Sequence, residues 1–145
     1  LAIIHSDTSS FNNQFNVELA DQYFSKLVRL YPKNKISYYN FGKYKQDIFQ
    51  YNEALKLYSR YLELDTSNKY IYYNMGFCFL QLEDYNQSIK AFTEAINLDN
   101  AFLIAYHARA YLYELINLPE KAKIDWKNCL MLNPSYIPAL EGLNK

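Results

Sequence analysis

Two histidines and two cysteines are the residues best suited to catalysis or metal binding, and their spacing supports neither. His5 and His107 stand far apart, and so do Cys78 and Cys129. The sequence has no His-Glu-x-x-His pattern, no paired-cysteine spacing, no glycine-rich phosphate loop and no nucleophile elbow. We therefore predict that the chain is not an enzyme and uses no cofactor and no metal ion.

Hydrogen bonding to a peptide backbone is the chemistry that two asparagines could supply. Asn40 and Asn74 hold equivalent places in an internal repeat of the sequence. A side-chain amide both donates and accepts, so it can hold a backbone without reading its sequence. The alternative is that both are solvated side chains in an asparagine-rich chain. Large aromatic side chains, which suit peptide recognition, accompany them: Tyr39, Tyr70, Tyr73, Phe77 and Tyr111.

The segment 69–100 must position the central members of this set, and its pattern predicts two short helices. Apolar residues recur every three or four positions in both halves, which is typical of one helical face. Glu83 and Asp84 form a polar turn between the halves. Because two short helices alone bury too little surface to be stable, we expect neighbours of the same kind.

The chain repeats this pattern with a period of about 34 residues. Each unit has a small residue in its first helix, and the three are Gly42, Gly76 and Ala110. A second small residue and an aromatic four positions later follow in the other helix: Ala20 and Phe24, Ala54 and Tyr58, Ser88 and Phe92, Ala122 and Trp126. With prolines closing two units, this register resembles the tetratricopeptide repeat. We expect the small residues to lie where the two helices of a unit cross closely.

The resemblance implies an all-α fold, a right-handed superhelical solenoid of antiparallel helix pairs, with about 3.5 to 4 repeats and a C-terminal capping helix. We predict one domain over 1–145, divided into a degenerate first repeat at 1–34, repeats at 35–68, 69–102 and 103–136, and a capping helix at 137–145. Residues 1–14 fit worst and are interpreted as a degraded helix or an irregular lead-in. Arg109 replaces an apolar residue, so we expect a weakened contact or a side chain extended toward solvent.

In the family the first helices line the concave side. The resemblance thus predicts a peptide-binding groove made of Tyr39, Asn40, Lys43, Tyr70, Tyr73, Asn74, Phe77, His107 and Tyr111. None of these positions is expected to be needed for packing within a repeat. The alternative is that neighbouring first helices bury the aromatic rings against each other.

Chaperone-binding members of the family clamp a C-terminal carboxylate with Lys and Asn on one first helix, Asn on the next, and Lys and Arg on the third. Asn74 supplies the middle residue of this set. The other four places hold residues that do not match: Tyr39, Lys43, Ile104 and Ala108. We therefore expect no binding to chaperone tails.

The composition and the net charge of the chain limit the classes of partner that it can bind. Half of the residues are hydrophobic and the formal net charge is zero, which argues against a nucleic-acid partner. No apolar run approaches the roughly 20 residues of a membrane span, so we expect no membrane insertion within this segment. Cys78 and Cys129 are predicted as buried free thiols.

We predict a non-catalytic protein- or peptide-binding scaffold. The alternative is a structural or homo-oligomerisation module of a larger protein. The chain begins with Leu1, which we interpret as a sign of a fragment or a processed form. The cytoplasm is favoured, with the periplasm or a membrane tether as alternatives if a leader precedes Leu1.

Overall fold

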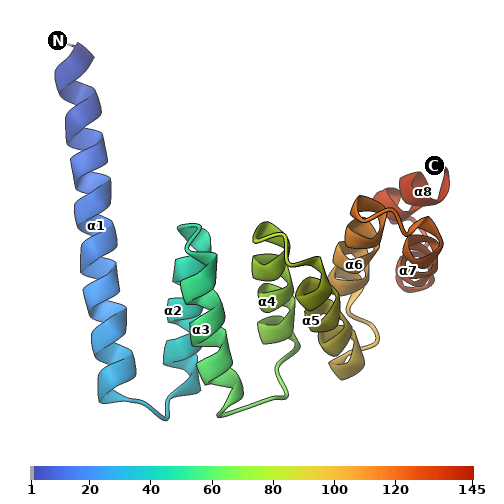
Figure 1. Ribbon diagram of the computed structural model, residues 1–145, viewed down its shortest axis with the longest axis horizontal. Coiled ribbons are helices and arrows are strands. Elements are labelled where there is room, and N and C mark those ends of the chain that lie inside the picture. The colour runs from blue at the N-terminus through green and yellow to red at the C-terminus, as the bar shows by residue number, and fades with distance from the viewer. Residues whose placement is uncertain (1) are drawn as a thin grey trace.

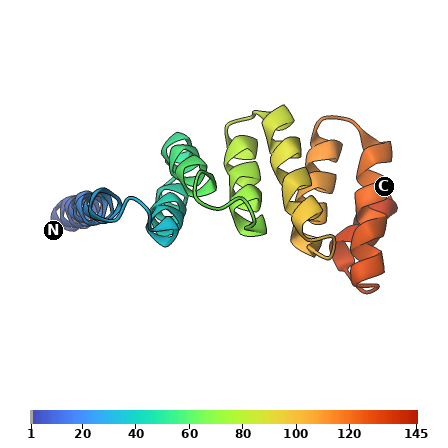
Figure 2. The same ribbon diagram turned by 90° about the horizontal axis from the view of Figure 1, so that it is seen from below.

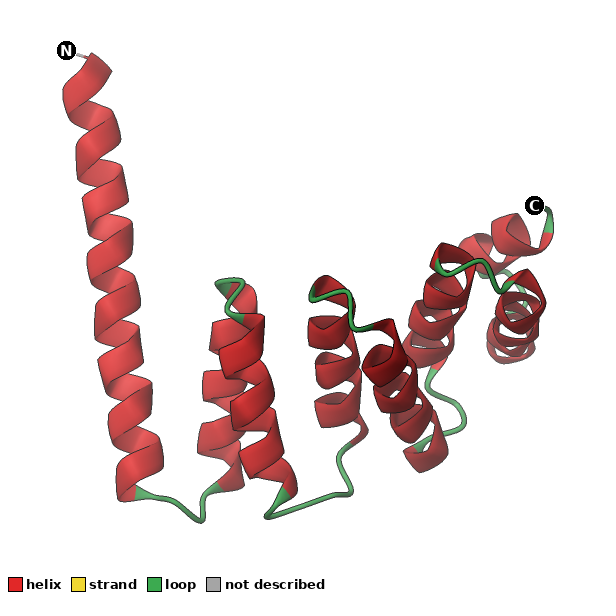
Figure 3. Ribbon diagram, viewed as in Figure 1, coloured by secondary structure: helices red, strands yellow, loops and turns green. Residues whose placement is uncertain are grey.

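The computed structural model describes residues 2–145, with side chains described from Asn16 onward. The described residues form eight helices and no strands (Figures 1 and 3). The helices are α1 (Ala2–Leu30), α2 (Lys35–Asp47), α3 (Tyr51–Leu62), α4 (Lys69–Gln81), α5 (Tyr85–Leu98), α6 (Leu103–Leu115), α7 (Pro119–Leu132) and α8 (Ile137–Leu143).

Three helix pairs follow one another along the molecule: α2 with α3, α4 with α5, and α6 with α7 (Figures 1 and 2). This arrangement confirms the predicted all-α helical-repeat solenoid. The pairs lie within the intervals 35–68, 69–102 and 103–136, and α8 lies within 137–145. The division into repeats at those boundaries stays a prediction.

The turn inside each pair places one residue in the left-handed backbone region. These residues are Phe49, Glu83 and Asn117, with φ of 63°, 59° and 59°. The next N–H in each turn donates to a carbonyl five residues earlier, at 2.8 Å in the first pair, 2.9 Å in the second and 2.8 Å in the third. Such bonds satisfy the open carbonyls at a helix end. The recurrence of this turn in all three pairs shows that the repeat governs backbone conformation as well as packing.

The two helices of a pair cross at the predicted small residue. A Cβ atom on Gly76 would lie 2.6 Å from the Phe92 ring, and one on Gly42 would lie 2.7 Å from the Tyr58 ring. Ser88 Oγ donates to the backbone oxygen of Gly76 at 2.7 Å, inside the core. These contacts confirm that the small residue allows the close approach of the paired helices.

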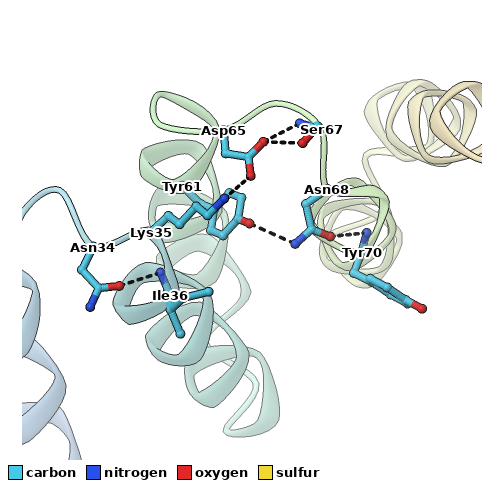
Figure 4. A network of polar contacts seen from close by, with 8 residues as sticks. All are labelled: Asn34, Lys35, Ile36, Tyr61, Asp65, Ser67, Asn68 and Tyr70. Atoms are coloured by element: carbon cyan, nitrogen blue, oxygen red, sulfur yellow. Dashed lines mark hydrogen bonds and ion pairs between the residues drawn. The ribbon is translucent and has the colours of Figure 1, made fainter.

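An ion pair joins the beginning of a first helix to the segment after its second helix. Lys35 Nζ lies 2.5 Å from Asp65 Oδ2 (Figure 4), and Lys69 pairs with Asp99 one repeat later. Hydrogen bonds from these lysines hold the pKa of both aspartates below the usual range. This ion pair therefore links the two ends of one repeat, and it occurs in two successive repeats.

Asparagines beside these pairs cap the first helices. Asn34 Oδ1 accepts from the N–H of Ile36 at 3.1 Å, and Asn68 Oδ1 accepts from the N–H of Tyr70 at 2.9 Å (Figure 4). Asn68 also donates to the Tyr61 hydroxyl at 3.0 Å. These bonds satisfy backbone N–H groups that lack a partner within the helix at its start. They also fix the positions of Ile36 and Tyr70 in the first turns of α2 and α4.

The N-terminal segment differs from the expectation. α1 is one uninterrupted helix over Ala2–Leu30, so the alternative of an irregular lead-in is wrong. The physical reason lies in the sequence. Asp7 and Thr8 stand where the other repeats place a larger residue and Gly or Ala. Folding back would bury a carboxylate, which is costly without a partner.

α1 contacts the rest of the chain through α2. The Phe24 ring stacks on Phe41 and on Tyr44, each at 5.3 Å between centroids. Lys45 Nζ lies 2.7 Å from Asp21 Oδ1. The N-terminal part of α1 projects beyond the other helices (Figure 1).

Candidate functional site on the first helices

The first helices α2, α4 and α6 form a continuous surface. α2 packs on α4 and α4 packs on α6, whereas in the described part of the chain the second helices lack comparable contacts with one another. Helices that approach each other more closely lie on the inner side of a curved stack. The surface of α2, α4 and α6 is therefore the concave face, and all nine predicted groove residues come from these three helices.

An apolar row crosses the concave face near the N-terminal ends of its helices. Ile36, Tyr70 and Ile104 are 53%, 49% and 42% exposed. They hold the same place in successive repeats, so each repeat contributes one side chain to the row. Tyr70 belongs to the predicted groove set, and the repeat register places Ile36 and Ile104 at the equivalent concave positions. Their signal in the sequence is the shared repeat position.

A second row lies farther along the same helices. Tyr111 is exposed, and Phe77 is half-buried with its ring edge-on to Tyr51 at 6.2 Å. Lys43 holds the equivalent place in α2, and its Nζ lies 2.5 Å from Asp47 Oδ1. This ion pair offsets the charge of Lys43, so the second row is aromatic and close to neutral.

A third row of side chains on the first helices packs against neighbouring helices and does not line the groove. The Tyr73 ring lies 5.7 Å from Phe92 of its own repeat and 5.6 Å from Phe102 at the start of the next. Tyr39 packs edge-on to Tyr61 at 6.5 Å. The expectation that no groove position is needed for packing within a repeat is wrong for these rings. They join second helices to first helices.

His107 holds the third place of that row. Its ring lies 5.3 Å from the Trp126 ring, and its Nδ1 lies 2.5 Å from the Tyr136 hydroxyl oxygen. Burial lowers the pKa of His107, so the imidazole is neutral at neutral pH. Its contacts join α6 to α7 and to the segment before α8. It therefore acts in packing at the C-terminal end of the face.

The two asparagines of the predicted groove, Asn40 and Asn74, differ in their exposure to solvent. Asn40 is exposed, but Asn74 is 8% exposed. Burial raises the pKa of the Tyr58 hydroxyl, and a hydrogen bond with Asn74 opposes that rise. Tyr58 itself donates to Gln46 Oε1 at 2.8 Å. Asn74 thus belongs to a buried polar contact between α3 and α4, which sequence position alone did not reveal.

Arg109 also differs from the expectation of a weakened or solvent-extended contact. Its Nε and Nη2 donate to the two carboxylate oxygens of Asp125 at 2.7 and 2.8 Å. Its Nη1 donates to Thr93 Oγ1 at 2.8 Å. Asp125 is 1% exposed, so this two-pronged ion pair is an internal connection among α5, α6 and α7. Asp125 could not be identified from the sequence, because an isolated carboxylate carries no repeat signal.

The remaining reactive groups are inert in character. Cys78 and Cys129 are free and buried, as predicted. Burial raises the pKa of the Cys78 thiol to about 12 and that of Cys129 to about 11, so both stay protonated at neutral pH. Among the described residues no group of three or more His, Cys, Asp or Glu side chains is arranged to hold a metal ion. None of the described helices is long and apolar enough to cross a membrane.

Comparison with known proteins supports this description. Residues 70–102 match the family model described as tetratricopeptide repeat. No curated protein sequence matches the chain. A crystal structure of MamA is similar, with a TM-score of 0.79 and 23% identity, covering 83% of this chain and 70% of that one.

Two further solved structures are also similar, and both concern peptide binding. The second TPR domain of human RPAP3, in complex with the HSP70 peptide SGPTIEEVD, has a TM-score of 0.70 and 26% identity, covering 75% of this chain and 91% of that one. YrrB, described as a TPR protein with an unusual peptide-binding site, has a TM-score of 0.72 and 22% identity, covering 83% of this chain and 62% of that one. The chain thus carries a tetratricopeptide repeat at residues 70–102 and shares the fold of tetratricopeptide-repeat proteins.

Proposed function

We propose that the concave face of α2, α4 and α6 binds an uncharged, apolar peptide segment of a partner protein, without catalysis. The observation that carries the proposal is the exposed row of Ile36, Tyr70 and Ile104. Contiguous exposed apolar side chains mark interaction surfaces more often than isolated ones do. Three successive helices present such a side chain at one repeat position, which favours a surface kept for binding.

Tyr111 and Phe77 extend the apolar row across the face. A tyrosine supplies a rigid apolar surface and a polar hydroxyl at low entropic cost, which suits the centre of a binding site. Asn40 is the exposed amide on the same face and can hydrogen-bond a bound backbone. Two proteins of this fold support the proposal: the RPAP3 domain is in complex with an HSP70 peptide, and YrrB is described as having an unusual peptide-binding site.

The charges of the face favour a neutral ligand. Ile104 and Ala108 stand where a chaperone clamp would place Lys and Arg, and Tyr39 stands where it would place its first Lys. Lys43 is the cation of the second row, and Asp47 pairs with it. An acidic peptide would therefore lose hydration without gaining a free cation, so we expect the acidic chaperone tails to bind poorly.

The test compares groove variants with a matched surface variant. A library of labelled peptides that are uncharged and rich in apolar residues is titrated against the wild type by fluorescence anisotropy. Tyr70→Ala and Ile104→Ala should each weaken the best peptide about tenfold, which corresponds to about 1.4 kcal/mol. Met131→Ala, an equally apolar change at a largely exposed site on α7, should leave the affinity unchanged.

The acidic peptide SRMEEVD, which an RPAP3 domain binds, serves as the negative control. Preference for this peptide over the uncharged ones would overturn the proposed ligand chemistry. Equal affinity of the Tyr70→Ala variant, the Ile104→Ala variant and the wild type for the best peptide would remove the concave face from the binding mechanism.

A further inference from the structure

Phe49, in the turn between α2 and α3, combines two features that do not favour stability. Its backbone lies in the left-handed region, with φ of 63°, where a bulky side chain is strained and rare. The residue is also 77% exposed, so its ring gains little from burial. The equivalent places in the next two turns hold the polar residues Glu83 and Asn117. The turn therefore needs this backbone conformation but does not need an aromatic side chain.

The Phe49 ring continues the concave face to its edge. It lies edge-on to the Tyr51 ring at 6.3 Å between centroids, and Tyr51 lies edge-on to Phe77 of α4 at 6.2 Å. Phe77 belongs to the second row of the concave face. The turn between α2 and α3 lies on the same edge of the molecule as the turn between α4 and α5 (Figures 1 and 3). Phe49 is therefore not a scattered surface residue, and we call Phe49, Tyr51 and Phe77 the aromatic edge.

The charges beside the aromatic edge are already neutralised. On α2, Lys43 pairs with Asp47 at 2.5 Å, and Lys45 pairs with Asp21 of α1 at 2.7 Å. On α3, Glu53 pairs with Lys56 at 2.9 Å. A charged group of a ligand would lose hydration there without gaining a free counter-charge. The surroundings of the Phe49 ring thus favour an uncharged, apolar occupant.

We propose that Phe49 is a specificity-determining residue of the peptide site and contacts an aromatic side chain of the bound peptide, while Tyr51 orients the Phe49 ring. The inference rests on the proposed peptide binding by the concave face, and it adds what the peptide must contain. Aromatic rings attract one another in edge-on and offset arrangements beyond the burial of their area. A bound aromatic side chain gives the Phe49 ring the burial that it lacks in the free chain.

Replacing Phe49 by asparagine separates binding from folding. Asparagine tolerates the left-handed region, and the chain itself has Asn117 in the third turn. The thermal midpoint of Phe49→Asn should equal or exceed that of the wild type, because the change relieves strain and removes little buried surface. Its affinity for labelled, uncharged peptides with one Phe or Tyr should fall about fivefold. Glu83→Asn makes the matched change one repeat later and should leave this affinity unchanged.

A second set of peptides identifies the group that Phe49 contacts. In these peptides alanine replaces the Phe or Tyr, and fluorescence anisotropy measures both sets against the wild type and Phe49→Asn. The variant should weaken the alanine peptides less than about twofold, because the partner of the ring is absent. Equal weakening of both sets would refute the aromatic contact. A thermal midpoint of Phe49→Asn clearly below that of the wild type would identify Phe49 as a packing residue and would also refute it.

Tyr70→Ala distinguishes a failure of this inference from a failure of the proposed function. If Tyr70→Ala weakens the aromatic peptides and Phe49→Asn does not, the concave face binds the peptide and Phe49 has no part in it. If neither variant weakens them, or the wild type binds neither set, both proposals are wrong. Sedimentation velocity at the assay concentration covers the remaining occupant. A wild-type dimer that Phe49→Asn abolishes would show that a second copy, and not a peptide, covers the ring.

Discussion

Replacing Gly76 by alanine tests the packing on which the repeat depends. The added Cβ would lie 2.6 Å from two carbons of the Phe92 ring. That ring is 1% exposed and lies against Tyr73, so it has little room to shift. Overpacking of this kind typically costs about 1–3 kcal/mol, whereas alanine gains about 1 kcal/mol over glycine from helix propensity. We therefore expect a net loss of up to about 2 kcal/mol in the free energy of unfolding.

Urea denaturation followed by circular dichroism measures this loss, and Phe92→Leu supplies the matched variant. Phe92→Leu alone should destabilise the chain, because it removes buried ring atoms. In the double variant the smaller side chain relieves the overlap with the methyl group added by Gly76→Ala, so the two costs should not add. The equivalent place in the next repeat holds Ala110, and Ala110→Gly should lose about 1 kcal/mol from propensity alone. A Gly76→Ala variant more stable than the wild type, with additive costs in the double variant, would refute the close crossing.

Three further predictions follow from buried or paired polar groups. Arg109→Leu should cost about 3–5 kcal/mol in the free energy of unfolding, since it leaves the Asp125 carboxylate buried without its partner; urea denaturation of this variant beside the double variant with Asp125→Leu, which should recover stability, checks it. The hydrogen bond from Lys35 lowers the folded-state pKa of Asp65, so the Lys35–Asp65 ion pair stabilises the fold above the unfolded pKa of Asp, near 3.9, and this stabilisation is lost as pH falls. Between about pH 6 and 2, the thermal midpoint should therefore fall less for Lys35→Met than for the wild type. Asn74→Ala should lower the free energy of unfolding by about 1–3 kcal/mol, because the amide is buried beside a polar group. A urea denaturation midpoint equal to that of the wild type would show that Asn74 is not needed for packing and belongs to the open groove.

The periodic features of the fold could be predicted from the sequence. Gly42 and Gly76 recur with the aromatic residues that they face, and the register places both partners of each crossing. The three helix pairs follow from that register. The left-handed turns at Phe49 and Glu83 were not predictable from residue type, because only Asn117, the third equivalent, is a residue that favours this region. In that case the backbone conformation is set by the packing of the two helices.

The features that break the repeat could not be predicted in the same way. Arg109 and Asp125 neutralise each other inside the molecule, and nothing in the spacing identifies such a pair. The continuity of α1 depends on what a folded-back segment would bury. Asn74 shares its repeat position with the more exposed Asn40 and Ala108, and only the neighbouring side chains decide its burial. The groove on the first helices stays a prediction, and the packing of Tyr39, Tyr73 and His107 removes several of the residues first assigned to it.

Residue-resolved NMR titration with an uncharged, apolar peptide is the most direct test of binding by the concave face. Isotope-labelled chain is used at a concentration low enough to keep it monomeric. Our account predicts the largest shift changes at Ile36, Tyr70, Ile104 and Tyr111, with small changes on α3, α5 and α7. Shift changes confined to those second helices, or to α1 and α8, would contradict the central claim that the first helices bind the partner.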